Sequence, residues 1–207
     1  MNLYKSNETF VEIDTFPPHL PSYRYWKDYK EDILKMFSYS TNLTETVKAY
    51  GKKLLSEDTH VLCVHTRRGD FIQHKTLLES RKEFVESSIE YVVNFLKVRF
   101  LQNIDLVLYG TDNKFIDGLK IKKSNFNSIH KSKARTKGED LAFAALHCHS
   151  FIHTASASSY GWWMAYLRQR KGFVFYNSQQ KKNKKHIIKK DDYDIFPPDC
   201  FIIPYLA

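Results

Sequence analysis

From His60 onward, the sequence alternates between short apolar runs and longer amphipathic segments. The apolar runs are typical of β-strands and lie at 60–65, 104–109, 150–154 and 172–176. A weaker run of the same kind lies at 126–129. Strands that alternate with helices form right-handed βαβ units, in which helices cover both faces of a parallel sheet. The alternation therefore predicts an α/β fold, with a Rossmann-like parallel sheet flanked by helices.

The segments around these runs have the spacing of helices. Apolar residues between Val85 and Phe100 line one stripe, which predicts a helix over about 81–100. Further helices are expected at these ranges: 27–37, 42–56, 113–119, 138–148 and 159–170. Prolines at positions 17, 18 and 21 exclude a helix from about the first 25 residues. We divide the chain into a partial, linking helical segment at 1–58 and a Rossmann-like domain with a Lys-rich tail at 59–207.

The net charge of +9 at pH 7 implies an anionic partner. Charge by itself is compatible with nucleic acid, a membrane surface or a nucleotide. Six lysines crowd between Lys181 and Lys190, and we interpret this run as a solvated loop. A patch for nucleic acid would have aromatic residues among the lysines, and this run has none. No nucleic acid partner is therefore expected.

The three cysteines, Cys63, Cys148 and Cys200, are too few for a disulfide framework, and an odd number leaves one unpaired. Cys63 lies in a strand-like run, where we expect it to be a buried apolar residue. No uninterrupted apolar stretch approaches the length of about 18 residues that a membrane span needs. Two glycosylation sequons begin at Asn7 and Asn42, which gives slight support to a lumenal protein.

The sequence His65-Thr66-Arg67-Arg68-Gly69-Asp70 follows the first apolar run directly. Loops that follow the strands of a parallel sheet hold its ligands. Two adjacent guanidinium groups suit a diphosphate, because each can make paired hydrogen bonds to anionic oxygens. Arg67 and Arg68 are therefore candidates for binding phosphate, with Asp70 holding an arginine in place. The alternative is a surface turn with an ion pair.

Three further strings lie where a strand or loop meets a helix. Asp112 follows the run 104–109 and would contact the nucleotide or cap the next helix. Asp140 opens a short helix and would either accept hydrogen bonds from guanine or complement the helix dipole. Ser158 and Ser159 precede a helix, where they would bind phosphate or act as caps. No P-loop or Gly-x-Gly-x-x-Gly string is present.

No metal site is expected. His147 and His149 would point about 200° apart on a helix, and His153 lies beyond a turn. Asp192-Tyr193-Asp194 has the Asp-x-Asp form of metal-dependent glycosyltransferases, but it lies in a polar tail and not after a core strand.

These strings resemble the motifs of the α-1,2-fucosyltransferases, glycosyltransferase family 11. Residues 65–71 are similar to the family's His-x-Arg-Arg-Gly-Asp-Tyr motif, and 111–113 to its short acidic string. Residues 139–142 resemble its Glu-Asp-Leu segment, and 158–167 its Ser-x-Phe-Gly/Ser-Trp-Trp-Ala-Ala-Tyr-Leu motif. A weaker similarity to Gln-Ser-x-x-Tyr-Phe lies at 21–26. The motifs occur in the family's order.

The resemblance implies a GT-B architecture, of which this chain would be the donor-binding half. It implies inverting, metal-independent transfer of L-fucose from GDP-fucose to a sugar hydroxyl, usually of galactose. No cofactor is implied beyond GDP-fucose as the donor substrate and a glycan as the acceptor. By analogy, Arg67 and Arg68 would serve the pyrophosphate and Asp140 would read guanine. The phosphate would also contact Ser158 and Ser159, and Asp112 would lie near the nucleotide.

The resemblance also sets out what we expect to be missing. Family members carry an N-terminal half with a glycine-rich loop near the acceptor, which we do not find in this sequence. Animal members are held on the lumenal side of the Golgi membrane by an anchor, which this sequence also lacks. Inverting transfer needs a base to accept the acceptor proton. Asp70 and His65 are candidates, and the base can also belong to the other half.

Two other functions are weighed beside fucosyl transfer. One is a truncated, non-catalytic protein that binds a GDP-sugar or acts as a scaffold. The other, less favoured, is a basic domain that binds nucleic acid through the lysine-rich tail, with steep salt dependence.

Overall fold

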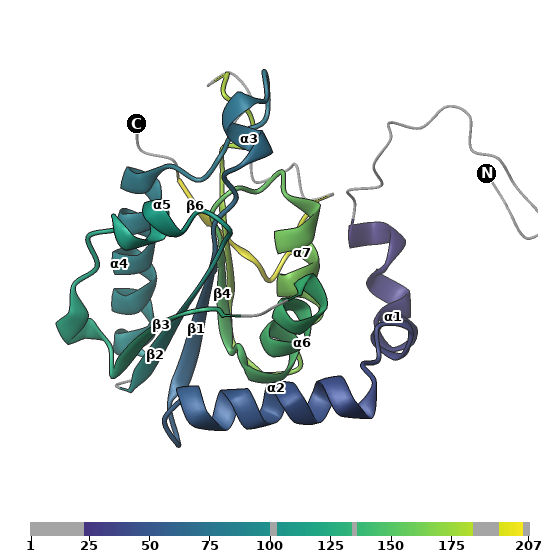
Figure 1. The fold of residues 1–207 in the computed structure, drawn as a ribbon. Helices are drawn as coiled ribbons and strands as arrows, with labels where there is room; N and C mark the ends of the chain where they lie inside the picture. Colours follow the sequence, from purple (N-terminus) through teal and green to yellow (C-terminus); the bar gives the residue numbers. More distant parts are fainter. Residues whose placement is uncertain (1–22, 100–102, 134–135, 184–194, 205–207) are drawn as a thin grey trace, which may run out of the picture.

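The computed structural model describes residues 23–99, 103–133, 136–183 and 195–204. Within these residues, a six-stranded sheet of strictly parallel strands forms the centre (Figure 1). The strands are β1 (His60–His65), β2 (Ile104–Tyr109), β3 (Ser128–Lys131), β4 (Ser150–His153), β5 (Val174–Asn177) and β6 (Phe201–Ile203). The predicted α/β class, with a parallel sheet flanked by helices, is confirmed.

The strands lie in the order β3-β2-β1-β4-β5-β6. This is the strand order of the classic Rossmann fold. The chain moves outward from β1 through β2 to β3, then returns to lay β4 along the other side of β1. In this register His65 lies beside Tyr109 of β2 and beside His153 of β4. The order of the strands reverses between β1 and β4, and sheets of this kind bind ligands at the carboxyl ends of the strands at such a switch point.

Helices cover both faces of the sheet, as Figure 1 shows. One face carries α4 (Lys82–Val98) and α5 (Asn113–Asp117). The other face carries α6 (Lys137–His147), α7 (Ser159–Tyr166) and α2 (Thr41–Leu54). Strand residues alternate between these layers: Leu62 packs with the α4 layer, whereas Val61 packs with the α2 and α6 layer. Both layers bury apolar side chains, because a parallel sheet is apolar on both sides.

The N-terminal segment is helical, as expected. It comprises the short 3₁₀ turns η2 (Tyr23–Tyr25) and η3 (Lys27–Tyr29), then α1 (Lys30–Met36) and α2. Val47 of α2 is buried in the core that α6 shares with the sheet. The boundary at residues 58 and 59 stays a prediction. No helix within the described ranges is both long and apolar enough to cross a membrane.

Several elements differ from the expectations, and the short helix α3 (Asp70–Gln73) after β1 was not predicted. Helix α7 ends at Tyr166 and not at 170, and Arg168 turns back so that its Nε donates to the Ala165 carbonyl at 3.0 Å. Strand β6, which lies beside β5, was not predicted. It has only three residues within what we interpreted as a lysine-rich tail. Of that lysine run, Lys182 is half-buried and pairs with Glu79 at 3.4 Å, and residues 184–194 lie outside the described ranges.

Cys63 is buried, as expected, but it is more than an apolar side chain in the core. Cys63 of β1 forms a disulfide with Cys148, which follows α6, and both residues are fully buried. The hydroxyl of Tyr109, on β2, lies 3.5 Å from the Cys148 sulfur. The bond therefore joins the central strand to the helix layer above it. Cys200 is the free cysteine among the described residues.

Asp105 is a buried carboxylate near the start of β2, and its hydrogen bonds tie together segments that are distant in sequence. It accepts hydrogen bonds from Ser128 Oγ at 2.6 Å, Thr59 Oγ1 at 2.7 Å and the Ser56 amide at 2.8 Å. Burial by itself would raise the pKa of Asp105. These hydrogen bonds, together with one from Asn127, lower the pKa by more than burial raises it, so the net shift is downward.

Replacing Asp105 with Asn is expected to lower the free energy of unfolding by about 1–3 kcal/mol, because the donors lose a charged acceptor. The folded pKa lies below the unfolded one, so the stabilisation is complete above about pH 4 and is lost as the pH falls further. Urea unfolding at pH 7 and pH 3.5 measures both effects. Asp117→Asn, which removes an exposed pair with Lys131, is the control and should cost below about 1 kcal/mol. An equal effect of both variants would contradict the assignment.

Candidate functional site

The loop after β1 lies at the carboxyl edge of the sheet and carries both arginines. Arg68 is fixed there on three sides. Its Nε lies 3.4 Å from the Asp112 carboxylate, its Nη1 donates to the Ser80 carbonyl at 3.1 Å, and its guanidinium carbon lies 4.5 Å from the centre of the Phe115 ring. A guanidinium held in this way loses little further entropy when it binds an anion.

Arg67 lies beside Arg68 and is held from the other side of the loop. Its Nη2 pairs with the Asp70 carboxylate at 2.8 Å, and its guanidinium lies over the Phe71 ring at 5.1 Å. Its Nε is buried without a hydrogen-bond partner among the described residues. Gly69, the next turn residue, has φ of +47°, a conformation that side chains disfavour. The turn thus presents one arginine with an unused donor.

Of the two roles that the sequence left open for Asp112, nucleotide contact and helix capping, the structure shows the second and adds a contact with Arg68. Its Oδ1 caps α5 by accepting a hydrogen bond from the Phe115 amide at 2.9 Å. Its Oδ2 faces Arg68, as described above. Capping and the placement of the arginine therefore use different oxygens of one carboxylate. No bound nucleotide is needed to explain its position.

A chain of hydroxyl groups beneath the arginine loop was not predicted. Ser80 Oγ accepts from the Arg67 amide at 2.8 Å and lies 2.7 Å from Thr154 Oγ1. Thr154 in turn donates to the His65 carbonyl at 2.7 Å. These buried bonds lock the loop after β1 against the end of β4. Thr154 directly follows a strand and was detectable by that position, whereas Ser80 lies in a loop with no sequence signal.

The N-terminus of α7 lies next to the ends of β1 and β4. Ser158 is the buried N-cap residue, and its Oγ accepts from the Gly161 amide at 3.5 Å. Its hydroxyl proton stays available to a ligand. Ser159 is exposed in the first turn. A side chain at Gly161 would lie 2.5 Å from the His153 ring and 2.6 Å from His65 Nδ1. The glycine thus lets the helix start close to the strand ends.

His65 and His153 end β1 and β4 and lie side by side, with ring centres 5.8 Å apart. Both rings are buried, and His65 Nδ1 and both His153 nitrogens have no hydrogen-bond partner among the described residues. Burial lowers the pKa of His153 to about 3. Burial, His153 and Arg67 lower the pKa of His65 well below its usual value. Both imidazoles are therefore neutral at pH 7.

These imidazoles make the fold sensitive to acid. The unfolded chain binds protons near pH 6.5 that the folded chain excludes, so stability is full above that pH and falls below it. Each imidazole is expected to remove about 1.4 kcal/mol between pH 7.5 and pH 5.5. Urea unfolding at the two pH values measures the slope. His153→Gln should reduce the loss of stability between the two pH values by the contribution of one imidazole. An unchanged loss would show that His153 does not cause this pH dependence.

Asp140 lies apart from the arginine loop, at the start of α6. Its Oδ1 accepts from Ser132 Oγ at 2.5 Å, just beyond the end of β3. Burial raises the pKa of Asp140, although the Ser132 hydrogen bond opposes that shift. Tyr160 lies between the two regions: its ring centre is 5.8 Å from that of His65, and its hydroxyl donates to the Lys137 carbonyl.

The structure therefore brings one subset of the predicted site residues into direct contact. Arg68 and Asp112 pair with each other, and Arg67 pairs with Asp70. His65 and Ser158 lie on the neighbouring strand end and helix cap. No hydrogen bond or ion pair joins Asp140 to the arginines within the described ranges. The role of each residue toward a ligand stays a prediction.

Comparison with known proteins assigns the family. The sequence model of Glycosyl transferase family 11 matches residues 4–196. A galactoside 2-alpha-L-fucosyltransferase of Caenorhabditis elegans is 28% identical over 147 residues, which are 66% of this chain and 38% of that protein. A second protein of the same name and organism is 23% identical over 164 residues, covering 69% of this chain and 40% of that one. A solved structure of POFUT1 in complex with GDP has a TM-score of 0.47 and 13% identity, over 70% of this chain and 50% of that one.

The sheet has the Rossmann strand order and carries two arginines at its switch point. The match to the family model extends over nearly the whole chain. The chain belongs to glycosyl transferase family 11. It spans 38% and 40% of the length of the two curated relatives named above.

Proposed function

We propose that this chain forms the donor-binding part of an enzyme that transfers L-fucose from GDP-fucose to a galactose hydroxyl in α-1,2 linkage. The observation that carries the proposal is the paired placement of Arg67 and Arg68 at the sheet's switch point, in a chain of glycosyl transferase family 11. The names of its relatives, galactoside 2-alpha-L-fucosyltransferases, support the choice of sugar and linkage.

The two arginines have the chemistry that departure of GDP requires. As the bond between fucose and phosphate breaks, negative charge builds on the pyrophosphate. Preorganised guanidinium groups stabilise that charge more in the transition state than in the ground state. In this proposal they take the place that a divalent metal has in other transferases, so the reaction is metal-independent. Attack by the acceptor from the opposite face then gives inversion at the anomeric carbon.

The remaining predicted residues are proposed to orient the donor. The exposed hydroxyl of Ser159 and the first-turn amides of α7 offer donors to a phosphate oxygen, with Ser158 supplying its free proton. Asp112 would act through Arg68. Asp140 would accept the N1–H and N2–H of guanine, and two such donors would favour its charged form over the protonated form that burial favours.

Of the two candidate bases, we favour Asp70. Its side chain is 66% exposed and accessible to an incoming acceptor, whereas His65 is only 4% exposed. Asp70→Asn is expected to lower kcat for fucose transfer about 10²- to 10⁴-fold while GDP affinity changes little. Calorimetry and a transfer assay separate these effects. A lower GDP affinity with unchanged kcat would assign Asp70 only to holding Arg67.

Calorimetric titration of the purified chain with GDP-fucose, GDP and UDP, each with and without EDTA, tests the donor site. We expect micromolar binding of the guanine compounds only, unaffected by EDTA. Transfer to a galactoside is then measured by release of GDP. Binding without transfer would favour the alternative of a non-catalytic GDP-sugar-binding protein. A folded chain that binds none of them would overturn the proposal.

We also propose the lumen of the Golgi as the compartment. The buried Cys63–Cys148 disulfide supports an oxidising compartment, because cytosolic thiols are kept reduced. Asn42, which begins a sequon, is exposed in the first turn of α2 and accessible to a glycan. Expression with a secretory leader, followed by glycosidase treatment and non-reducing mass analysis, tests both features.

A further inference from the structure

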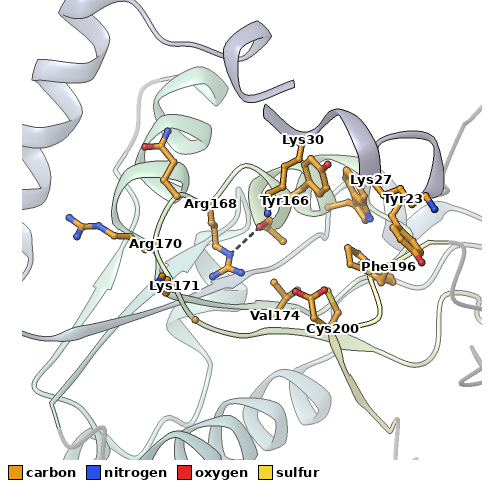
Figure 2. Close-up of a pocket in the computed structure, with 16 residues that line it drawn as sticks. Tyr23, Lys27, Lys30, Tyr166, Arg168, Arg170, Lys171, Val174, Phe196 and Cys200 are labelled. Atoms are coloured by element: carbon orange, nitrogen blue, oxygen red, sulfur yellow. Dashed lines mark hydrogen bonds between the residues drawn. The ribbon is translucent and has the colours of Figure 1, made fainter. Parts of the chain in front are cut away.

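A cavity of about 420 Å³ lies at the opposite end of α7 from the arginine loop (Figure 2). Its walls come from the N-terminal turns η2 and η3 with the start of α1, from the end of α7, and from the segment 196–200. Helix α7 begins at the candidate donor site and ends here, so the cavity is separate from the site described above. Its volume is within the range of small-molecule sites.

The lining of this cavity is strongly cationic. It includes the five basic residues Lys27, Lys30, Arg168, Arg170 and Lys171, against a single carboxylate, Asp199. None of these five cations makes an ion pair with a carboxylate in the described part of the chain. Lys27 and Lys30 are three residues apart, a spacing that places both on one face of the segment. Among the described residues, the cavity therefore has an excess of positive charge that nothing offsets.

Arg168 is the most enclosed of these cations. Its Nε donates to the Ala165 carbonyl and its Nη1 to the His149 carbonyl, which leaves Nη2 without a hydrogen bond to the described residues. Burial lowers the pKa of Arg168 to about 10, so it is still charged at neutral pH. Arg168 is half-buried and forms no ion pair with a carboxylate among the described residues, although the charge of Asp199 acts on it, so an anion beside it would stabilise it further. Figure 2 shows Arg168 between the lysines of the N-terminal segment and Cys200.

The wall opposite Arg168 is aromatic. Tyr166 lies beneath the Lys30 ammonium, which is 5.6 Å from its ring centre, and stacks on Trp162 at 4.8 Å. Its hydroxyl donates to the Trp26 carbonyl, which fixes the ring. Tyr23 and Phe196 lie nearby (Figure 2). Fixed ring faces beside cations suit a ligand with a flat apolar side and an acidic substituent.

We propose that this cavity binds an acidic sugar, meaning a saccharide unit that carries a sulfate, phosphate or carboxylate group. The acidic group would pair with Arg168, Lys27 and Lys30, and the apolar side of the sugar ring would lie against Tyr23, which also lines the cavity. A nucleic acid fits less well, because it needs a continuous basic groove and this is a bounded cavity. The chain also belongs to a family of glycosyl transferases, whose substrates are saccharides.

The test titrates the full chain with N-acetylglucosamine 6-sulfate, followed by NMR at constant ionic strength. Neutral N-acetylglucosamine, sodium sulfate and a short single-stranded oligonucleotide are titrated in parallel. The double variant Lys27→Gln with Lys30→Gln removes two exposed cations of the cavity. Lys52→Gln with Lys53→Gln removes the same charge from the exposed surface of α2 and is the matched control. Thermal melts establish that both variants are folded.

We expect the sulfated sugar to bind at least tenfold more tightly than the neutral sugar or sulfate. The cavity variant should lose at least tenfold in affinity, and the control variant should lose less than twofold. Equal losses in both variants, equal binding of the neutral sugar or of sulfate, tighter binding of the oligonucleotide, or no binding at millimolar concentration would each overturn the proposal. GDP titration should be unchanged in the cavity variant, so this test does not depend on the donor site.

Discussion

Replacement of Arg67 by alanine is expected to reduce affinity for GDP about 10- to 100-fold. Arg67 has a buried Nε without a partner, and its guanidinium is aimed by Asp70 and Phe71. A charge-assisted hydrogen bond to a phosphate contributes about 1.5–3 kcal/mol, which corresponds to this range. Calorimetric titration with GDP measures the loss. Arg67→Lys keeps the charge but not the forked geometry, so it should restore only part of the affinity.

The matched control is Arg99→Ala, which removes the same charge from the far end of α4, where Arg99 lies over the Phe95 ring. GDP affinity should be unchanged in this variant. If Arg67→Ala keeps full affinity while melting like the unmodified chain, Arg67 does not bind the donor. Arg68→Ala is less informative, because Arg68 also holds Asp112 and the Ser80 carbonyl and its loss would disturb the loop.

Removal of the Cys63–Cys148 disulfide is expected to lower the free energy of unfolding by about 2–5 kcal/mol. The bond joins residues that are 85 positions apart, and closing so long a loop restricts the unfolded chain strongly. The double variant Cys63→Ala with Cys148→Ala should therefore show a lower urea midpoint. Dithiothreitol should produce a similar change in the unmodified chain and none in the variant.

Cys200→Ala is the control for this experiment. Burial raises the pKa of the Cys200 thiol to about 12, so it is protonated, and it lies outside the disulfide. Its replacement should leave the response to dithiothreitol intact. A double variant that is as stable as the unmodified chain, or a stability that dithiothreitol does not change, would contradict the assigned stabilisation.

Much of the fold follows from local patterns of apolar residues, which predict individual strands and helices without reference to the rest of the chain. The apolar runs at 60–65 and 104–109 correspond residue for residue to β1 and β2, because a central strand is buried on both faces. Strand β6 escaped prediction since three residues at a sheet edge carry almost no pattern. Helix α7 was overextended because its end depends on Arg168 folding back onto the Ala165 carbonyl.

For the site, the positions of the motifs in the sequence predicted which residues gather, but not which carboxylate pairs with which arginine. Residues that follow strands in a parallel sheet must gather at one edge, so Arg67, Arg68 and Asp112 could be expected near one another. Which carboxylate holds which arginine depends on side-chain directions, and these placed Asp70 with Arg67 and Asp112 with Arg68. The contact between the Ser80 and Thr154 hydroxyls could not be predicted, because it depends on the path that the loop after β1 takes in three dimensions.

The sequence by itself determined the alternation of strands and helices, the motifs after the strands and the membership of a family, because each is a property of neighbouring residues. Only the tertiary structure decided the rest. It paired Cys63 with Cys148, left His65 and His153 buried together, and enclosed Arg168 among lysines and aromatic rings. These relations join residues far apart along the chain, and their energies depend on distance and burial, which chain order does not specify.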